Sequence, residues 1–397
     1  MNAPLEGLRI ADFSRVLAGP LATMTLADLG AEVVKVERPG AGDDTRQWGP
    51  PWTEHASSYF ECVNRSKRSI TLDLRDPADL AVAVELATGA DVVVENFLTG
   101  TMDRLGLGYD ALAAANPGLV YCSITGFGSG AGARLPGYDF VVQAVGGLMS
   151  ITGQPEGDPT KVGVALVDVL TGKDAVIGIL AALREREVSG RGQRIEVNLL
   201  SSLLGSLVNQ ASAVLTTGRS PSRMGNQHPS IAPYETLHCA DGLLAVACGN
   251  DAQFARLCEV LGRPGLAEDV AVWAQTAEEA APEMSFRSNP DRVAHRQELI
   301  AALEEALAEA DAATWVTRLN AAGIAAGPVN DLAAAIAFAD SLGLDPTMPV
   351  GQGHPDQIRH PVTWGRSRLP DPTPPPDLGE HTDQIRAQLG HQPKETR

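Results

Sequence analysis

Residues 161–172, KVGVALVDVLTG, contain a single carboxylate, Asp168, in an otherwise almost wholly apolar run. Burial disfavours the ionised form of a carboxyl group, so such a residue needs a partner, becomes protonated, or has a chemical role. A helix cap, or an ion pair with a distant Arg or Lys, is the structural alternative. A lone Asp more often has one of these structural roles, so Asp168 is a candidate for chemistry that the rest of the sequence has to support.

Other familiar catalytic motifs are missing from the chain. The eight histidines show no metal-ligand spacing, and there is no HExxH, GxSxG or Walker sequence. The glycine-rich stretch GFGSGAG (126–132) lacks the GxGxxG spacing of a dinucleotide-binding loop and predicts a turn. We therefore expect neither a metal site nor a nicotinamide site.

Short β-rich runs alternate with helical patterns in the first 130 residues, which predicts parallel βαβ units. The expected strands cover residues 8–14, 31–37, 68–74, 90–97 and 119–127, and the expected helices 20–30, 77–89 and 109–118. Ligands of such sheets bind beyond the carboxyl ends of the strands. The segments FSRVLAGP, VERPGAGD and VENFLTG are strand exits of this kind.

Basic residues gather near these exits, although the whole chain is acidic. The chain has 49 acidic and 31 basic residues and a formal net charge of −18, which argues against binding to nucleic acid or to an anionic membrane. A small anionic ligand needs only a local group of bases. The candidates are Arg15, Arg38, Arg65, Lys67, Arg68, Arg75 and Arg104.

A length of 397 residues predicts two domains. Residues 138–216 are mainly helical, with helices expected over 138–153, 173–190 and 199–218 and a strand over 193–199. Residues 217–330 form the expected linker and smaller domain, with a hairpin turning on Asp241-Gly242 and helices between 251 and 319. The proline-rich stretch 369–384 predicts an extended chain.

The five cysteines are scattered and odd in number, and no CxxC occurs. This predicts neither a disulfide framework nor a zinc site and favours a reducing cytoplasm. The first residues lack the pattern of a signal peptide, and no apolar run reaches the roughly 18 residues that span a bilayer. We expect a soluble cytoplasmic protein.

Several long motifs resemble those of the class III CoA-transferases, the family of formyl-CoA and carnitine CoA-transferases. They occur in the family's order along the whole chain: LRIADFSRVLAGP, GAEVVKVERPGAGDDTR, VNRSKRSITLDL, VENFLTG, GYDFVVQAVGGLMSITG, VALVDVLTG and PPPDLGEHT. GDDTRQWGPPW, CSITGFG, SIAPYE and GNDAQF most resemble the succinyl-CoA:glutarate and related dicarboxylate enzymes.

The resemblance implies a role for Asp168 as the nucleophile that takes an acyl group from an acyl-CoA. Coenzyme A would be a co-substrate, a free carboxylic acid the acceptor, and no metal would be required. The positions that match the family's CoA site are Arg15, Val16, Ala18, Arg38, Leu72, Arg75, Asn96, Phe97, Arg104 and Tyr138. Gly249 and Asn250, in the segment nearest to the family's glycine-rich loop, are implied oxyanion donors.

Three positions depart from the formyl-CoA branch: Arg15 replaces a histidine, Leu17 a glutamine and Pro136 a lysine. These differences disfavour formate and oxalate as substrates and favour a roomier site for a larger dicarboxylate. The distal carboxylate of such a substrate needs a cation, and the candidates are Arg223, His228, Arg292 and Arg296.

The fold that the resemblance implies is α/β. A large Rossmann-like CoA-binding domain, residues 1–216 with 331–397 returning to it, carries an inserted small α+β domain. Two chains would form a homodimer of interlocked rings.

Three other functions remain open at this point. The α-methylacyl-CoA racemases share the fold but need paired acid and base groups, and Tyr138 stands where they have a histidine. A noncatalytic CoA-binding protein is the second alternative. A nucleotide-dependent oxidoreductase, without the expected glycine fingerprint, is the third.

Overall fold

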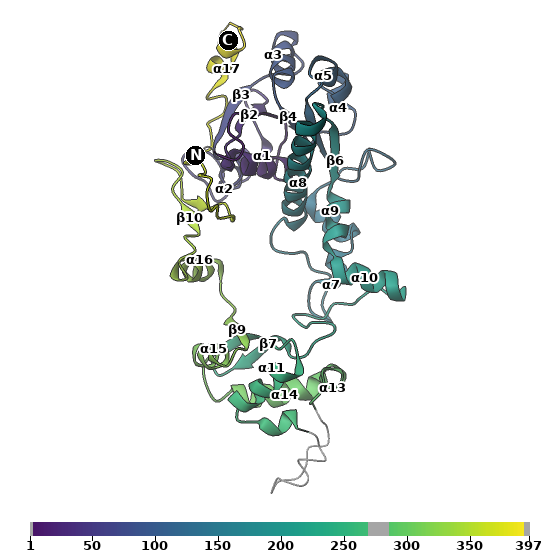
Figure 1. Cartoon of the computed structure of the whole chain (residues 1–397), viewed down its shortest axis with the longest axis vertical. Helices are drawn as coiled ribbons and strands as arrows, with labels where there is room; N and C mark the ends of the chain where they lie inside the picture. The colour runs from purple at the N-terminus through teal and green to yellow at the C-terminus, as the bar shows by residue number, and fades with distance from the viewer. Residues whose placement is uncertain (1–2, 269–285, 393–397) are drawn as a thin grey trace. The chain divides into compact units, whose positions relative to one another are not determined.

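The computed structural model describes residues 3–268 and 286–392. The chain forms two compact units (Figure 1). The first comprises residues 1–149, 161–221 and 343–397, so both ends of the chain contribute to it. The second comprises residues 150–160 and 222–342.

A six-stranded parallel sheet organises the first unit, in the order β3-β2-β1-β4-β5-β6. Its strands are β1 (Arg9–Asp12), β2 (Glu32–Glu37), β3 (Lys67–Thr71), β4 (Val92–Glu95), β5 (Val120–Thr125) and β6 (Arg194–Asn198). This confirms the predicted βαβ units and the strand expected over 193–199. The order is that of a doubly wound sheet, and it reverses between β1 and β4.

Helices cover both faces of the sheet because neighbouring strand residues point to opposite sides. Ile10 packs with α1 (Ala18–Asp28), α8 (Leu166–Ser189) and α9 (Leu199–Ser206). Ala11 packs on the other face with α3 (Pro77–Thr88), α5 (Tyr109–Ala115) and Ile385 of α17 (Thr382–Gln388). Helix α17 lies in the returning C-terminal segment, where the His381 N–H donates to the carbonyl of Ser69 at 2.9 Å.

Two expected helices are broken in the structure. Residues 138–153 form α6 (Asp139–Val145) and α7 (Leu148–Ile151), separated at Gly147, which has a φ of +87° that favours glycine. The helix expected over 199–218 is α9 and α10 (Val208–Thr217), bent by 80°. Conversely, the Asp168 segment opens α8 directly, and this helix continues to Ser189.

The second unit has a three-stranded antiparallel sheet, β7 (Tyr234–Cys239), β8 (Gly242–Ala247) and β9 (Ala325–Pro328). The predicted hairpin at Asp241-Gly242 is confirmed, whereas strand β9 was not expected. In the described part of this unit, the α-helices are α11 (Asp251–Val260), α13 (Asn289–Ala294), α14 (Arg296–Leu307), α15 (Ala312–Ala321) and α16 (Leu332–Ser341). Part of the helical region expected between 251 and 319 lies outside the described residues.

Shorter elements complete the first unit. They are the helices α2 (Ser58–Glu61) and α4 (Thr101–Arg104), and the paired strands β10 (Thr347–Met348) and β11 (Gln357–Ile358). The proline-rich tail is extended up to α17, which begins inside the stretch expected to be extended. Within residues 3–268 and 286–392, no single helix is long and apolar enough to cross a bilayer. The bent pair α9 and α10, taken together, has the length and the apolar composition of a span, and nothing else supports that role.

Candidate active site

The loops that follow β1 and β4 meet at the point where the strand order reverses. Asn96 joins them: its side-chain oxygen accepts the Arg15 N–H at 2.9 Å, and its amide nitrogen donates to the Arg15 carbonyl at 2.7 Å. Both hydrogen-bonding groups of the Arg15 backbone are therefore held by one side chain. The predicted strand exits do come together, as parallel-sheet geometry requires.

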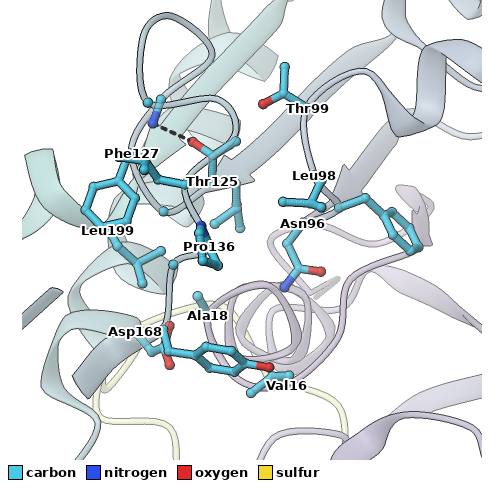
Figure 2. Close-up of a pocket in the computed structure, with 18 of the residues that line it drawn as sticks. Val16, Ala18, Asn96, Leu98, Thr99, Thr125, Phe127, Pro136, Asp168 and Leu199 are labelled. Carbon is cyan, nitrogen blue, oxygen red and sulfur yellow. Dashed lines mark hydrogen bonds between the residues drawn. The ribbon is translucent and has the colours of Figure 1, made fainter. Parts of the chain in front are cut away.

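A cavity of about 270 Å³ opens beside these loops. In Figure 2, Asp168 lies near Ala18, and Asn96 and Leu98 lie on the other side of the cavity. The loop after β5 supplies a further wall, in which Thr125 Oγ1 accepts the Gly128 N–H at 3.0 Å. The predicted site residues that line this cavity are Arg15, Val16, Ala18, Asn96, Phe97, Tyr138 and Asp168.

A second cavity, of about 520 Å³, adjoins the first, because Arg15 and Phe97 line both. The remaining predicted residues lie there: Arg38, Leu72, Arg75 and Arg104. The Leu72 side chain is buried, whereas the three guanidinium groups are exposed around the opening. The second cavity thus combines an apolar floor with a cationic rim, which suits a ligand with a flat ring and phosphates.

Two buried polar atoms at the first cavity lack partners. In the described part of the chain, Arg15 Nε and Thr99 Oγ1 are among three buried side-chain nitrogen or oxygen atoms without a hydrogen bond. Buried polar groups are normally satisfied, so such atoms point to a missing partner. A ligand that passes through the first cavity would supply it.

Asp168 is placed by a close contact between two helices. It lies in the first turn of α8, and Gly172 follows one turn later. A Cβ atom at Gly172 would stand 2.8 Å from the carbonyl oxygen of Ala18, so only glycine lets α8 come this close to the start of α1. This approach brings the Asp168 carboxylate to the wall formed by Val16 and Ala18.

The Asp168 carboxylate is half-buried, and among the described residues it has neither an ion pair nor a hydrogen-bond donor. Burial, together with the negative charge of Asp139, raises the pKa of Asp168 to about 7. The same environment affects Tyr59, whose pKa is raised to about 12 by burial and by Asp168. A carboxylate that is poorly stabilised as an anion is suited to nucleophilic attack.

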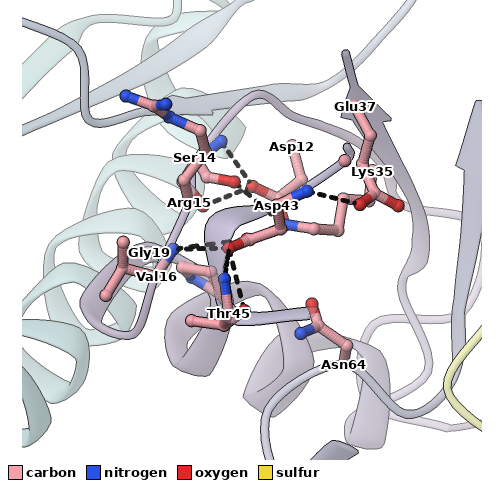
Figure 3. Close-up of polar contacts among 12 residues, drawn as sticks. Asp12, Ser14, Arg15, Val16, Gly19, Lys35, Glu37, Asp43, Thr45 and Asn64 are labelled. Atoms are coloured by element: carbon pink, nitrogen blue, oxygen red, sulfur yellow. Dashed lines mark hydrogen bonds and ion pairs between the residues drawn. The ribbon is translucent and has the colours of Figure 1, made fainter. Parts of the chain in front are cut away.

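Buried charges fix the loop that carries Val16 and Ala18 (Figure 3). Lys35 pairs with Asp43 at 2.9 Å and donates to the Ser14 carbonyl at 2.9 Å. Lys67 pairs with Asp12 at 3.2 Å and donates to the carbonyl of Pro20 at 2.9 Å. All four charged side chains are fully buried.

In both ion pairs, the lysine lowers the pKa of the carboxylate. Burial alone would raise the pKa of Asp12, but Lys67 and Lys35 hold this pKa below its ordinary value. Burial acts in the same direction on Asp43, and Lys35 lowers its pKa to about 2. Both carboxylates are therefore ionised near pH 7, and the loop is anchored at Ser14 and Pro20.

The model of CoA-transferase family III matches residues 5–382. This chain belongs to CoA-transferase family III. The transferase is 41% identical over 386 residues to succinyl-CoA:glutarate CoA-transferase of Mus musculus, which covers 96% of this chain and 85% of that protein. It is 41% identical over 397 residues to succinate–glutarate CoA-transferase of Agrobacterium fabrum, covering 97% and 96% of the two chains.

The solved structures agree with this assignment. A CaiB/BaiF family protein from Brucella suis superposes with a TM-score of 0.85 at 43% identity, over 98% of this chain and 100% of that one. The expected family and the α/β fold are confirmed. The transferase is thus an enzyme of the CoA-transferase type, and coenzyme A is its co-substrate.

Gly249 and Asn250, which were proposed to bind an oxyanion, have hydrogen-bond partners within the protein. The Gly249 N–H donates to the side-chain oxygen of Gln253 at 2.7 Å. The Asn250 side chain caps α11 by accepting the Gln253 N–H at 2.9 Å. Both lie in the second unit, whereas Asp168 lies in the first.

The cations considered for a distal carboxylate are also engaged within the protein. Fully buried Arg292 pairs with Asp251 at 2.6 Å and donates to backbone carbonyls. Arg296 pairs with Glu235 at 2.7 Å. Arg223 donates to the carbonyl of Gly157 at 2.7 Å, and His228 Nδ1 accepts the Ser230 N–H at 3.1 Å. Among the described residues that line the cavity of Asp168, Arg15 is the one with a cationic side chain.

Sequence reasoning missed several residues that shape this site. Asp139 follows Tyr138 directly, but a carboxylate in the motif GYDF gives no local sign that it faces another acid. Lys35 lies in a β-rich segment and Asp43 in a polar one, and neither segment indicates that the two residues form an ion pair. A charged residue in the middle of a buried strand was the available signal, since an unpaired Lys is rarely buried.

Within the described residues, no group of three or more His, Cys, Asp or Glu side chains is arranged to hold a metal ion.

Proposed function

We propose that this enzyme transfers coenzyme A from an acyl-CoA to a free dicarboxylate through covalent intermediates on Asp168. The observation that carries the proposal is an unpaired, half-buried carboxylate in a cavity that adjoins a cation-rimmed one. Succinyl-CoA as donor and glutarate as acceptor are the pair that we favour, because they are named in two relatives at 41% identity.

The reaction begins when an Asp168 carboxylate oxygen attacks the thioester carbonyl, forming an aspartyl-acyl anhydride and releasing the CoA thiolate. The thiolate attacks the aspartyl carbonyl, which releases the donor acid as a carboxylate and leaves an aspartyl-CoA thioester. The acceptor carboxylate attacks this thioester to form a second anhydride and the thiolate again. Attack of the thiolate on the acceptor acyl carbonyl gives the new acyl-CoA and restores the Asp168 carboxylate.

The residues around the two cavities have separable roles in this scheme. Arg38, Arg75 and Arg104 hold the phosphates, while Leu72 and Phe97 provide apolar surface for the adenine. Arg15, Asn96 and the loop with Val16 and Ala18 guide the thiol end toward Asp168. Arg15 has an unpartnered Nε and stands in the position where the formyl-CoA branch has histidine.

The test is an exchange assay. The protein is incubated with succinyl-CoA and a panel of mono- and dicarboxylic acids, and acyl-CoA products are followed by mass spectrometry. We expect glutaryl-CoA to form, and transfer to fall by more than about 10³-fold in Asp168→Ala. A hydroxylamine adduct at Asp168 would mark the covalent step. Undiminished transfer in Asp168→Ala would contradict the mechanism.

A racemase of the same fold is the alternative with a direct test. The residues that line the cavity of Asp168 include Tyr138 and no histidine among those described, whereas two-sided proton exchange needs an acid and a base. Deuterium uptake at an α-carbon from D₂O without any CoA transfer would select the racemase.

The enzyme is proposed to act as an interlocked homodimer. Helix α16 has no buried residue, and Leu332 and Phe338 on it are 85% and 57% exposed. A groove of about 920 Å³ in the first unit has mainly apolar walls, to which α1 and α8 contribute. Apolar surfaces of this kind mark subunit contacts. Light scattering that gives a monomeric mass at micromolar concentration would contradict this assembly.

We further propose a cytoplasmic location. All five cysteines, each among the described residues, are free thiols, and Cys122, Cys248 and Cys258 are buried. Burial raises the pKa of these three thiols, which keeps them protonated and unreactive. Cell fractionation with a cytosolic marker tests this location.

A further inference from the structure

The helix that carries Asp168 does not cap its own N-terminus. Ala165 occupies the N-cap position of α8 and has no side-chain acceptor. Asp139, from α6, provides the cap instead, because its Oδ2 accepts the N–H groups of Val167 at 2.7 Å and of Asp168 at 3.2 Å. The first N–H groups of a helix need such acceptors, so the capping carboxylate comes from a different element of the fold.

Gln143, one turn after Asp139 on α6, completes the contact. Its amide nitrogen donates to Asp139 Oδ1 at 2.6 Å, and its oxygen accepts the Val162 N–H at 2.9 Å. Gln143 is fully buried, and Asp139 is 9% exposed. These two side chains therefore hold the chain at both Val162 and Asp168.

The capping contact also brings two acids together. A helix N-terminus normally stabilises a nearby anion, but here its N–H groups are directed to Asp139. Asp168 therefore faces a negative charge instead of free donors. Tyr59 of α2 also interacts electrostatically with Asp168, but its phenol is neutral near pH 7 because burial and Asp168 raise its pKa to about 12. Burial is the larger cause of the raised pKa of Asp168, and Asp139 is the charged group that adds to it.

We propose that Asp139 is a positioning residue that orients the first turn of α8 and favours acylation of Asp168 through charge repulsion. This inference rests on the proposed role of Asp168 as the nucleophile. Formation of the anhydride or of the aspartyl-CoA thioester removes the charge of Asp168 and with it the repulsion from Asp139. The contact therefore destabilises the free carboxylate more than either covalent intermediate, and this difference favours acylation.

Asp139→Asn tests the electrostatic part, because it removes the charge and keeps an oxygen that can accept the two N–H groups. We expect the acid limb of the pH profile of kcat/KM to move to lower pH by about one unit. We also expect about tenfold less covalent enzyme at equilibrium with succinyl-CoA, measured by intact-protein mass spectrometry, since one pKa unit corresponds to a tenfold change in equilibrium.

A matched control is Asp311→Asn, which alters the capping aspartate of α15 in the other unit. It should change neither the acid limb nor the covalent fraction. An unchanged acid limb and covalent fraction in folded Asp139→Asn would overturn the proposal.

Asp139→Asn places a second side-chain amide against the amide of Gln143, so this variant can fail to fold. The double variant D139N/Q143E restores a donor and acceptor pair between positions 139 and 143 and moves the charge one helical turn along α6. It should fold, and the acid limb of its kcat/KM profile should lie at a lower pH than that of the unmodified enzyme. An acid limb at the same pH as in the unmodified enzyme would again overturn the proposal.

Asp168→Ala, measured in parallel, separates this inference from the proposed function. If Asp168→Ala retains transfer, the nucleophile assignment itself fails. If Asp168→Ala is inactive and Asp139→Asn matches the unmodified enzyme in both readouts, only the role of Asp139 fails.

Discussion

The backbone N–H of Val16 donates to both carboxylate oxygens of Asp43, at 3.3 and 3.2 Å. Val16 has a φ of +71°, which is rare and costly for a β-branched residue. Such a conformation persists only where its surroundings enforce it, and Asp43 is itself held by Lys35. The strained residue lines the cavity of Asp168, so the buried pair maintains the shape of the wall that faces this carboxylate.

Asp43→Leu should destabilise the protein and impair the site together. It leaves the fully buried Lys35 without its closest acid, and breaking a buried pair from one side costs about 3 kcal/mol or more. We expect this loss in the free energy of unfolding, measured by urea denaturation, and a higher KM for acyl-CoA.

The double variant K35M/D43L separates the two effects. Replacing both partners by apolar side chains should recover most of the stability, while the Val16 N–H still lacks its acceptor and the KM for acyl-CoA stays high. A double variant with normal KM would mean that the pair serves stability alone.

The pH dependence of transfer should follow ionisation of Asp168. In the proposed mechanism the attacking species is the carboxylate, and burial together with Asp139 raises the pKa of this group to about 7. We therefore expect kcat/KM to rise about tenfold per pH unit below pH 6 and to level off above about pH 7 to 8. A flat profile between pH 5 and 8 would be inconsistent with Asp168 as the attacking group in the free enzyme.

Asp168→Asn should stabilise the folded protein at alkaline pH. The pKa of Asp168 is about 7 when folded and near 3.8 when unfolded, so the unmodified protein loses stability as the pH rises through this window. Because the side chain keeps some solvent contact, we expect a gain of about 2 kcal/mol at pH 8, and no gain at pH 3. Thermal unfolding at both pH values checks this, and an equal difference at both would argue against the shift.

Gly172→Ala should weaken the enzyme, although alanine is normally the better helix residue. The added methyl group would stand 2.8 Å from the Ala18 carbonyl oxygen and push α8 away from α1. We expect a loss of about 1–3 kcal/mol in unfolding free energy and at least tenfold slower transfer.

Gly205→Ala in α9 is the control, because nothing lies within 4 Å of its added Cβ atom. It should leave transfer unchanged and keep or raise the melting temperature. Equal behaviour of the two variants would show that the close approach of the helices has no role.

Arg75→Ala should raise the KM for acyl-CoA about tenfold with a smaller effect on kcat, because a charge-assisted hydrogen bond is worth about 1.5–3 kcal/mol. Its side chain is 90% exposed at the second cavity and pairs with Asp73. Arg184→Ala, which removes an exposed cation paired with Glu187 on α8, is the matched control. A KM unchanged in Arg75→Ala would place the phosphates elsewhere.

Local patterns were sufficient for much of the fold. The alternation of β-rich and helical segments predicted the parallel strands, and parallel geometry then required their exits to meet, as the contact between Arg15 and Asn96 shows. Helix breaks were less predictable. The bend between α9 and α10 follows no proline, and it falls at Val208, whose φ of +29° interrupts the helix.

Asp168 could be selected from the sequence because a lone acid in an apolar run is unusual by itself, and the long motifs around it assign the family. Its environment could not be read in the same way. Asp139, which contacts the Asp168 backbone, precedes it by 29 residues. Gly172 is required because its helix packs against the Ala18 carbonyl of another helix. Lys35 lies in β2, and its partner Asp43 lies in the loop that follows this strand. Ionisation and close packing depend on distances through space, which the order of residues alone does not contain. The sequence therefore selects Asp168 as the candidate nucleophile, whereas its pKa and its position are set by the folded structure.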